Sequence, residues 1–259
     1  MTTVGREADG VGHAQLGLRG VGRSFGPEPG VHALRAVNVD VGVGEAVAVI
    51  GRSGSGKSTL LNLLGLLDSP TSGNYQIEGT RVEHLPESAR TRLRATFFGF
   101  VFQQSFLLGS RTAQENVEIP LYLQPNSRRE RQRRALEALS SVGLRHRAGF
   151  LPRAMSGGEC QRVAIARGIV HRPRVLLCDE PTGNVDEKTT GEVLQLLLAA
   201  SDAGMTLIMV THDLAVARAF PRILSVRDGS VSEGPGSFLD SESLTLGGQA
   251  GSSAPEGED

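Results

Sequence analysis

The sequence predicts an α/β fold built around a mainly parallel sheet. Short apolar runs alternate with longer segments of helical character, which is the pattern of strands joined by covering helices. One apolar run leads through a glycine-rich loop into a leucine-rich helix, and two more runs flank a second helix. In chain order these segments are Ala46–Ile50, Gly51–Thr59, Leu60–Leu67, Val175–Cys178, Glu187–Ala200 and Thr206–Val210. Strands that are apolar throughout are typical of a sheet buried on both faces.

The glycine-rich loop carries the strongest motif of the chain. It fits the pattern G-x-x-x-x-G-K-[ST] with residues Gly51, Arg52, Ser53, Gly54, Ser55, Gly56, Lys57, Ser58 and Thr59. A preceding strand and a following helix distinguish a phosphate-binding P-loop from a Gly-Ser linker. The glycines let backbone N–H groups close around a polyphosphate, and the helix N-terminus adds the positive end of its dipole. We expect Lys57 to reach the β- and γ-phosphates, and Ser58 to offer its hydroxyl to Mg²⁺.

The choice of lysine in this loop supports the same interpretation. Lysine and arginine together number 27, yet only Lys57 and Lys188 are lysines. A chain that otherwise uses arginine places a compact point charge where a P-loop needs one. The sequence therefore predicts a nucleotide-binding protein.

The composition gives no support for several other classes of protein. The formal net charge of −1 argues against a general affinity for nucleic acid or a membrane surface. Tryptophan is absent, so a stacking platform for single-stranded nucleic acid is not expected. Cys160 and Cys178 form no disulfide framework and suit a reducing cytosol. The chain has no secretory signal at its start and no run near the ~20 apolar residues of a membrane span, so we expect it to be soluble by itself.

The other N-terminal segments predict strands separated by turns. Residues 1–14 are glycine-rich and polar, and we expect a flexible leader there. Alternation and turn residues predict strands over Leu16–Phe25, Ala36–Val43, Tyr75–Gly79 and Phe97–Phe102, with turns at Gly26–Gly30 and Asp68–Gly73.

The later segments predict helices and a polar end. From Arg111 to about Gly149 the apolar residues recur with helical period. The arginine-rich run Ser127–Arg134 inside this region is expected to be a solvated helix face; contact with a partner or a lipid headgroup is the alternative. From Glu233 onward lysine and arginine are absent, so residues 233–259 are expected to form a disordered acidic tail.

A second anion-binding feature follows at Ser156, Gly157 and Gly158. These residues precede an amphipathic helical segment, so they offer another helix N-terminus to an anion. One nucleotide does not need two such cradles from a single chain. We therefore expect a head-to-tail pair in which the P-loop of one subunit is closed by the Ser-Gly-Gly of the other.

The two constellations together resemble a known family. Ser-Gly-Gly-Glu-x-Gln-Arg at 156–162, followed by Asp-Glu-Pro-Thr at 179–182 after an apolar strand, resembles the nucleotide-binding subunit of an ABC transporter. The resemblance extends from about Leu16 to Val231. It implies an ABC ATPase domain over 15–232, with a P-loop NTPase core, a mainly parallel sheet, an antiparallel β-subdomain from the N-terminal strands, and a helical subdomain at about 104–170.

The resemblance also implies roles for single residues. Asp179 would hold Mg²⁺, Glu180 would be the general base, and His212 would be the switch histidine at the γ-phosphate. Gln103 matches the Q-loop glutamine that touches Mg²⁺ and water, and its neighbour Gln104 is the alternative. Asp186 falls in the D-loop, which communicates across the dimer.

Two positions carry alternatives of their own. Phe25 falls where the family stacks an aromatic ring on adenine, and the alternative is an apolar residue that ends a strand. Cys160 replaces a common glutamine near a helix N-terminus, where a thiol can be activated. Thiol-sensitive ATPase activity is therefore a hypothesis, with a neutral substitution as the alternative. Cys178 is interpreted as a small core residue.

Finer motifs resemble the branch of macrolide-export and lipoprotein-release ATPases. They are Asp179–Asp186, Pro70–Gly73, Phe98–Gln103 and Glu115–Leu121. The branch has a proline-containing segment where this chain has Leu107–Ser110, on the surface that would meet a permease.

The implied function is hydrolysis of ATP with Mg²⁺ in a homodimer or heterodimer of ATPase subunits. Hydrolysis would drive a conformational change in a separate membrane permease, of export or extrusion type. The protein would lie on the cytoplasmic face of the cell membrane, with membrane contact only through the permease and without nucleic acid.

Two other functions are weighed against this one. An ABC-type ATPase of DNA repair would carry coiled coils or cysteine clusters between Thr59 and Met155, and this interval has neither. A regulatory module that binds ATP without hydrolysing it is disfavoured by the presence of Glu180 and His212.

Overall fold

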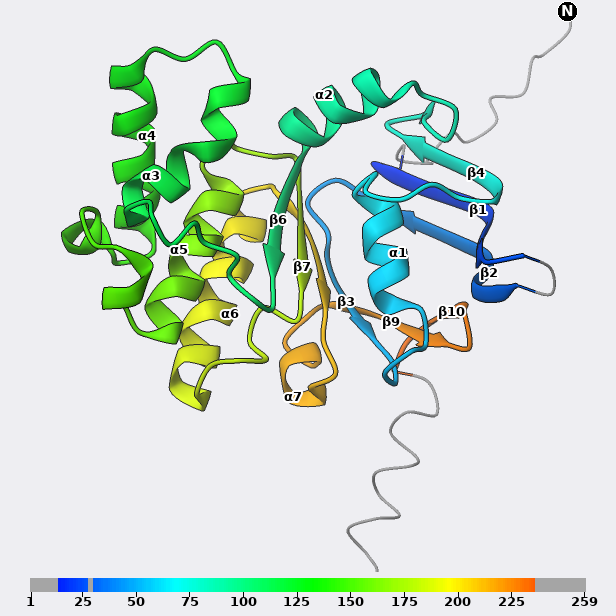
Figure 1. The fold of residues 1–259 in the computed structure, drawn as a ribbon. Helices are drawn as coiled ribbons and strands as arrows, with labels where there is room; N and C mark the ends of the chain where they lie inside the picture. The colour runs from blue at the N-terminus through cyan, green and yellow to red at the C-terminus, as the bar shows by residue number, and fades with distance from the viewer. Residues whose placement is uncertain (1–13, 28–29, 236–259) are drawn as a thin grey trace, which may run out of the picture.

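A computed structural model describes residues 14–27 and 30–235 of the chain. These residues form two sheets with one helix packed between them (Figure 1). The six-stranded sheet has the order β10 (Ser230–Glu233), β9 (Arg222–Arg227), β3 (Ala46–Ile50), β8 (Thr206–Val210), β7 (Val175–Asp179) and β6 (Phe98–Phe102). The four-stranded sheet has the order β2 (Val31–Val41), β1 (Leu16–Phe25), β4 (Ser72–Ile77) and β5 (Thr80–Arg81). The first sheet is parallel except at β10, and the second is antiparallel.

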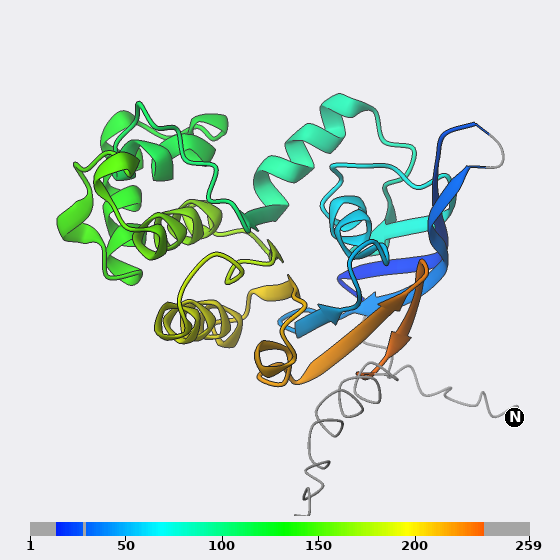
Figure 2. The same cartoon turned by 60° about the horizontal axis from the view of Figure 1, so that its bottom comes forward.

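The helices lie on both faces of the six-stranded sheet, as the two views show (Figures 1 and 2). In chain order they are α1 (Lys57–Leu64), α2 (Glu87–Phe97), α3 (Ala113–Glu118), α4 (Arg128–Ser141), α5 (Gly157–Ile169), α6 (Glu187–Asp202) and α7 (Leu214–Ala217). Short 3₁₀ turns accompany them at Ile119–Leu123, Arg145–Arg147 and Pro152–Ala154.

Strand β3 explains why the sheet is covered on both faces. All five of its residues are buried, and successive side chains point to opposite sides. Val47 and Val49 enter the core shared with α1 and the antiparallel sheet, whereas Ala48 and Ile50 enter the core under the remaining helices. The P-loop that follows β3 is therefore attached to a strand fixed from two sides.

Tyr75 joins the two sheets through α1. Its ring is fully buried in β4, and its hydroxyl donates a 2.6 Å hydrogen bond to the carbonyl oxygen of Leu64, the last residue of α1. Burial raises the pKa of this phenol well above its usual value, so the hydroxyl keeps its proton. The antiparallel sheet thereby holds the end of the helix that begins at the P-loop.

Helix α4 contains the arginine-rich run, and most of its charges have partners within the chain. Arg133 pairs with Glu130 and Glu137, and Arg131 stacks on the ring of Tyr122 at 4.4 Å. Arg134 donates to the carbonyl oxygen of Val170 at the end of α5. These contacts agree with a solvated helix face whose arginines are held locally.

Several boundaries differ from those expected from the sequence. The second strand begins at Val31 rather than Ala36, because the pairing with β1 contains register shifts and Ala36 has a φ of +46°, which together break the alternation. The first helix begins at Lys57 rather than Leu60. The strand expected over 75–79 covers Ser72–Ile77, and the single helical region over 111–149 contains two helices and two 3₁₀ turns.

Some elements were not predicted at all, namely β5, α2, α7, β9 and β10. Helix α2 is strongly polar and buries only Phe97, so it has no apolar stripe that periodicity could reveal. It leads directly into β6, which is why the strand begins at Phe98 rather than Phe97.

The expected leader and tail lie almost entirely outside the described residues. Of the tail, Glu233 is the last residue of β10 and pairs with Arg222 on β9. Residues 1–13 and 236–259 therefore leave those two expectations untested.

His171 is a buried imidazole at the end of α5 with a single hydrogen bond. Its Nε2 lies 2.9 Å from the carbonyl oxygen of Phe98, so Nε2 carries the proton, and its Nδ1 is buried with no hydrogen-bond partner. Burial lowers the pKa of this imidazole below the usual 6.5, and Arg134 lowers it further against the raising effect of the Phe98 carbonyl. The folded protein therefore disfavours protonated His171.

We expect the pKa of His171 to appear in the stability of the protein. The pKa of His171 is lower in the folded state than in the unfolded state, so the neutral imidazole favours folding. This stabilisation is complete above pH 6.5 and is lost as the pH falls from 6.5 through the folded-state pKa. The slope can reach about 1.4 kcal/mol per pH unit for one proton. Urea unfolding between pH 5 and 8 measures it, and His171→Gln should flatten the slope. The exposed His146→Gln is the matched control, and an equal slope in wild type and His171→Gln would contradict the assignment.

Candidate active site

The P-loop runs between the end of β3 and the start of α1, and two glycines make its path feasible. Gly51 has a φ of +156°, and a Cβ there would lie 2.3 Å from the carbonyl oxygen of Val226. Gly56 has a φ of +112°, and a Cβ there would lie 2.4 Å from the carbonyl oxygen of Ala33. A side chain at either position would collide with backbone, so the motif glycines are needed for close approach as well as for dihedral freedom.

The loop holds its own lysine inside. Lys57 is 7% exposed, and its ammonium group donates to the carbonyl oxygens of Gly51 at 2.8 Å and Arg52 at 3.0 Å. Burial lowers the pKa of Lys57, while the nearby carboxylates of Glu180 and Asp179 raise it. The Ser55 hydroxyl oxygen is buried in the same loop without a hydrogen-bond partner. A buried ammonium group and an unpaired hydroxyl suit the oxygens of a polyphosphate.

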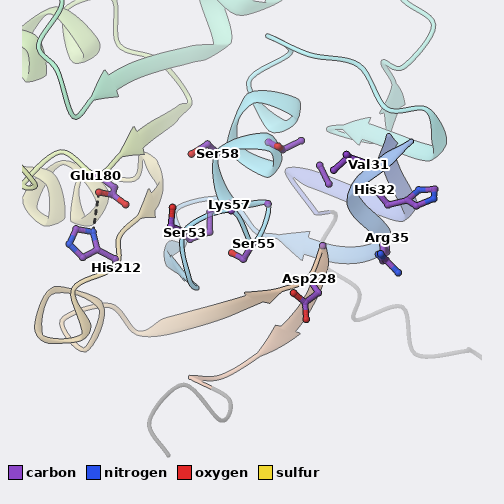
Figure 3. Close-up of a pocket in the computed structure, with 15 residues that line it drawn as sticks. Val31, His32, Arg35, Ser53, Ser55, Lys57, Ser58, Glu180, His212 and Asp228 are labelled. Carbon is purple, nitrogen blue, oxygen red and sulfur yellow. Dashed lines mark hydrogen bonds and ion pairs between the residues drawn. The ribbon is translucent and has the colours of Figure 1, made fainter. Parts of the chain in front are cut away.

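A cavity of about 610 Å³ opens over the loop (Figure 3). Its walls combine P-loop residues with the ends of other strands. The lining residues are Val31, His32, Ala33, Arg35, Ser53, Gly54, Ser55, Gly56, Lys57, Ser58, Thr59, Glu180, His212, Asp228 and Gly229. The cavity is large enough for a nucleotide-sized ligand.

Glu180 and His212 face each other at one side of this cavity (Figure 3). His212 Nδ1 lies 3.0 Å from Glu180 Oε2, and since an ionised carboxylate can only accept, Nδ1 carries the proton. Glu180 has a φ of +46° and is held there by bonds from its own N–H to Val210 O and from Gly183 N–H to its carbonyl. A non-glycine residue in this region is strained, and such strain gathers at functional sites.

Ser58 and Asp179 form the second polar pair of the site. Asp179 ends β7 directly before Glu180, and the Ser58 hydroxyl hydrogen-bonds its carboxylate. Burial raises the pKa of Asp179, with a further increase from Glu180, against the lowering effects of Ser58 and Lys57. A hydroxyl and a carboxylate are oxygen ligands of the kind Mg²⁺ prefers, so this donor set fits the ion.

Sequence reasoning missed the far wall of the cavity. Gly229, in the turn between β9 and β10, donates its N–H to the carbonyl oxygen of Ser55, and its own carbonyl accepts from the Arg35 N–H. Asp228 has a φ of +49° in this turn. An Asp-Gly pair is a turn signal that could have located it, but only the fold places the turn beside the P-loop.

Phe25 does not line the cavity. It ends β1 at 43% exposure, and the guanidinium of Arg23 lies over its ring at 4.3 Å. Its cross-strand partner Val31 lines the cavity instead. Phe25 therefore lies outside the cavity wall, and its contact with adenine stays a prediction.

The other predicted residues lie beyond the cavity wall. The amide of Gln103 lies so close to Gly183 that a Cβ on Gly183 would be 2.8 Å from its Nε2, and the Gln103 carbonyl accepts from Asn184 at 3.3 Å. Asp186 caps α6 by accepting from the Thr189 N–H at 3.0 Å. That bond holds the pKa of Asp186 below its usual value. Gln104 is exposed.

Ser156 caps α5 in a complete capping box. Its hydroxyl accepts from the Glu159 N–H, and the Glu159 carboxylate accepts from the Ser156 N–H at 2.8 Å. Gly158 packs against Thr189 of α6, where a Cβ would lie 2.7 Å from the Thr189 methyl group. Ser156, Gly157 and Gly158 therefore do not line the cavity of their own P-loop.

Within residues 14–27 and 30–235, no helix is long and apolar enough to cross a membrane.

A glycine-rich loop between a parallel strand and a helix, facing a Glu–His pair, defines the class of P-loop nucleotide hydrolases. Residues 34–183 match the ABC transporter family, and the chain belongs to that family. It is an ATP-hydrolysing, ATP-binding subunit of an ABC transporter, which confirms the fold, the enzyme class and the use of ATP with Mg²⁺ expected from the motifs.

Individual relatives agree with this family. The lipoprotein-releasing system ATP-binding protein LolD 2 of Caulobacter vibrioides is 46% identical over 216 residues, covering 83% of this chain and 95% of its own. The macrolide export ATP-binding/permease protein MacB of Escherichia coli K12 is 43% identical over 222 residues, or 85% of this chain. The match spans only 34% of the MacB chain.

A solved structure shows the same fold. The ATP-binding cassette MJ0796, a dimer in a post-hydrolysis state bound to ADP and Pi, superposes with a TM-score of 0.79 at 40% identity. The superposition covers 85% of this chain and 97% of that one.

The structure overturns the premise of an activated Cys160. The residue lies in the first turns of α5, but its thiol points toward the carbonyl oxygen of Pro152 at 3.6 Å. Burial raises the pKa of this thiol above 9.0, and the neighbouring carboxylate of Glu159 raises it further. Both effects favour the protonated thiol over the reactive thiolate. Cys178 is fully buried in β7, as expected of a core residue.

We expect slow alkylation of Cys160. Iodoacetamide at pH 7.5 should label it more slowly than glutathione, and the rate should increase as the pH passes 9, because only the thiolate reacts. Mass spectrometry of the labelled peptide measures the rate, with Cys160→Ser as the control. Labelling faster than glutathione at pH 7.5 would restore the idea of an activated thiol.

Proposed function

We propose that this chain hydrolyses ATP in a head-to-tail dimer and thereby drives a conformational change in a separate membrane permease of export type. The observation that carries the proposal is the separation of two anion-binding elements. The P-loop lies in the cavity, whereas Ser156–Gly158 lies against the start of α6 and does not line it. A nucleotide held by one P-loop is then enclosed only when a second subunit supplies its Ser-Gly-Gly.

The proposed roles follow from the positions of the polar groups. Lys57, the loop N–H groups and the Ser55 hydroxyl bind the polyphosphate of ATP. Ser58 and Asp179 would hold Mg²⁺, which when bound neutralises charge on the phosphate oxygens. Gln103 approaches from the end of β6 and would assist at the metal and the water, while Asp186 communicates across the dimer from the start of α6.

Glu180 is the general base of the proposed reaction. Its carboxylate accepts a proton from the attacking water while the water oxygen bonds to the γ-phosphorus and the bond from that phosphorus to the β-phosphate oxygen breaks. The products are ADP and inorganic phosphate. His212 donates a hydrogen bond from Nδ1 to Glu180 Oε2 and so orients the base. Its proposed contact with the γ-phosphate needs a second proton, on Nε2, because phosphate oxygens only accept hydrogen bonds.

The transport setting is inferred from the relatives and from the chain itself. LolD 2 and MacB are named for lipoprotein release and macrolide export, and this chain carries the finer motifs of that branch. A chain whose described helices cannot span a membrane needs a membrane partner for such work. We therefore place it on the cytoplasmic face of the membrane, in contact with a permease and with a second ATPase subunit, identical or related.

The Glu180→Gln variant tests the reaction and the dimer together. It keeps the size of the side chain but cannot take a proton, so ATP turnover should fall by about 10²–10⁴-fold. ATP should then accumulate in a stable dimer, seen as a doubling of mass in size-exclusion chromatography with light scattering. Equal slow turnover by wild type and variant would instead favour a regulatory module that binds ATP without hydrolysing it.

The Lys57→Ala variant tests the P-loop. Removing the ammonium group should abolish nucleotide binding, measured with a fluorescent ATP analogue, and with it the ATP-dependent dimer of a Glu180→Gln background. Lys188→Ala, which removes the other lysine from the first turn of α6, is the control for lost charge. ATP-dependent dimers of the Lys57→Ala protein would contradict the role of the loop.

A further inference from the structure

The loop after β6 is held in place by side chains from outside it. Three backbone carbonyl oxygens of the loop, and that of Phe102 at the end of β6, accept hydrogen bonds from other segments. Phe102 O accepts from Gln161 at 3.0 Å, and Gln103 O accepts from Asn184 at 3.3 Å. Ser105 O and Phe106 O accept from the two terminal nitrogens of Arg167, at 2.6 Å and 2.8 Å. Gln161 and Arg167 both belong to α5.

Arg167 binds backbone carbonyl oxygens rather than a carboxylate. No carboxylate pairs with it in the part of the chain that the structure describes, and burial lowers its pKa. Its planar fork spans two successive carbonyls, a geometry that a lysine ammonium group does not reproduce. Hydrogen bonds from a charged donor are stronger than those from a neutral one.

The backbone held by Arg167 is strained. Phe106 has a φ of +44°, and its ring is 61% exposed, with only an edge contact to Phe102 at 5.8 Å between centroids. The left-handed region is unfavourable for a bulky residue, because its Cβ approaches the following carbonyl oxygen. A mostly exposed ring provides little packing to offset this cost, whereas the bond from Arg167 to the Phe106 carbonyl does.

Helix α5 therefore links two functional segments, one at each of its ends. Its first residues form the Ser156–Gly158 anion site, and Arg167 in its last turn binds the loop that begins at Gln103. The helix is also packed backbone to backbone on β6, since a Cβ on Gly99 would lie 2.2 Å from the carbonyl oxygen of Gly168. A shift of the helix N-terminus must therefore be passed to the loop.

We propose that Arg167 is a positioning residue that couples the two ATP sites of the dimer. When Ser156–Gly158 of one subunit closes on ATP held by its partner, α5 moves, and the fork of Arg167 carries the loop and Gln103 with it. In the function proposed above, Gln103 assists at the metal and the water of the P-loop site in its own subunit. ATP bound at one site thus changes the activity of the other site. This coupling depends on the two hydrogen bonds from Arg167 to the carbonyl oxygens of Ser105 and Phe106. This inference rests on the head-to-tail dimer proposed above.

The Arg167→Gln variant tests the coupling. In wild type, ATP turnover should increase cooperatively with ATP concentration, with a Hill coefficient above 1. In the variant the coefficient should fall to about 1, and kcat should fall about tenfold or more because Gln103 is misplaced. Binding of a fluorescent ATP analogue to the isolated subunit should stay unchanged, because the P-loop is untouched. A merely structural arginine would lower the melting temperature without moving the Hill coefficient.

Hydrogen–deuterium exchange gives a readout independent of turnover. In a Glu180→Gln background, ATP should slow amide exchange over residues 103–108, and adding Arg167→Gln should remove that protection. Arg134→Gln is the matched control, because Arg134 also donates to a carbonyl at the end of α5, that of Val170, but to no carbonyl of the loop. It should leave both the cooperativity and the protection intact.

The outcomes separate this inference from the proposed function. If Glu180→Gln forms no ATP-dependent dimer, the head-to-tail arrangement fails. If the dimer forms but Arg167→Gln keeps the wild-type Hill coefficient and loop protection, or if the wild type shows no cooperativity, the coupling role of Arg167 is overturned. Should Arg167→Gln fail to fold, Arg167→Lys carries the test. It keeps the charge but not the fork, so its Hill coefficient should lie between those of wild type and about 1.

Discussion

The close approach of three backbones at the P-loop is the constraint on which the rest of the structure depends. Gly51 lies against Val226 of β9, Gly56 lies against Ala33 of β2, and Gly229 is hydrogen-bonded to Ser55. These contacts bring the parallel sheet, the antiparallel sheet and the β9–β10 turn to one point. A phosphate-binding loop needs N–H groups free of other partners, and a loop in that condition has little internal stability. Its shape is therefore imposed from outside.

The residues proposed for catalysis and those proposed to respond to the partner subunit are positioned by different kinds of structure. Asp179 ends the buried strand β7 and Glu180 follows it directly, so their positions are set by the sheet. Gln103 and Ser156 are positioned by loops, caps and a helix that packs on β6 through two glycines. The first group suits chemistry that needs fixed distances, and the second suits elements that move between states.

Much of this could be predicted from the sequence because the decisive signals are local. The P-loop, the Ser-Gly-Gly helix start and the carboxylates after β7 are short motifs in a recognisable context. The wall made by Arg35 and Asp228, and the bonds from Arg167, join segments far apart in the chain. The Asp-Gly pair at 228–229 marks a turn, but no local pattern places that turn beside the P-loop or marks the bonds from Arg167. The surroundings of Cys160 were hidden for a related reason, since desolvation by its neighbours depends on packing that the helix position alone does not reveal. They favour a neutral substitution, and thiol-sensitive ATPase activity stays a hypothesis.

The separation of the P-loop from Ser156–Gly158 also bears on where the protein can work. A site divided between two chains is complete only when the chains associate. For free subunits, the fraction of complete sites therefore falls as the subunit concentration falls. A membrane partner that holds two copies side by side replaces the bulk concentration by an effective concentration, which for short connections reaches the millimolar range. Docking to such a partner would then be required for efficient ATP turnover, in addition to the partner's role as the protein that turnover acts on. Subunits that are not docked would consume little ATP.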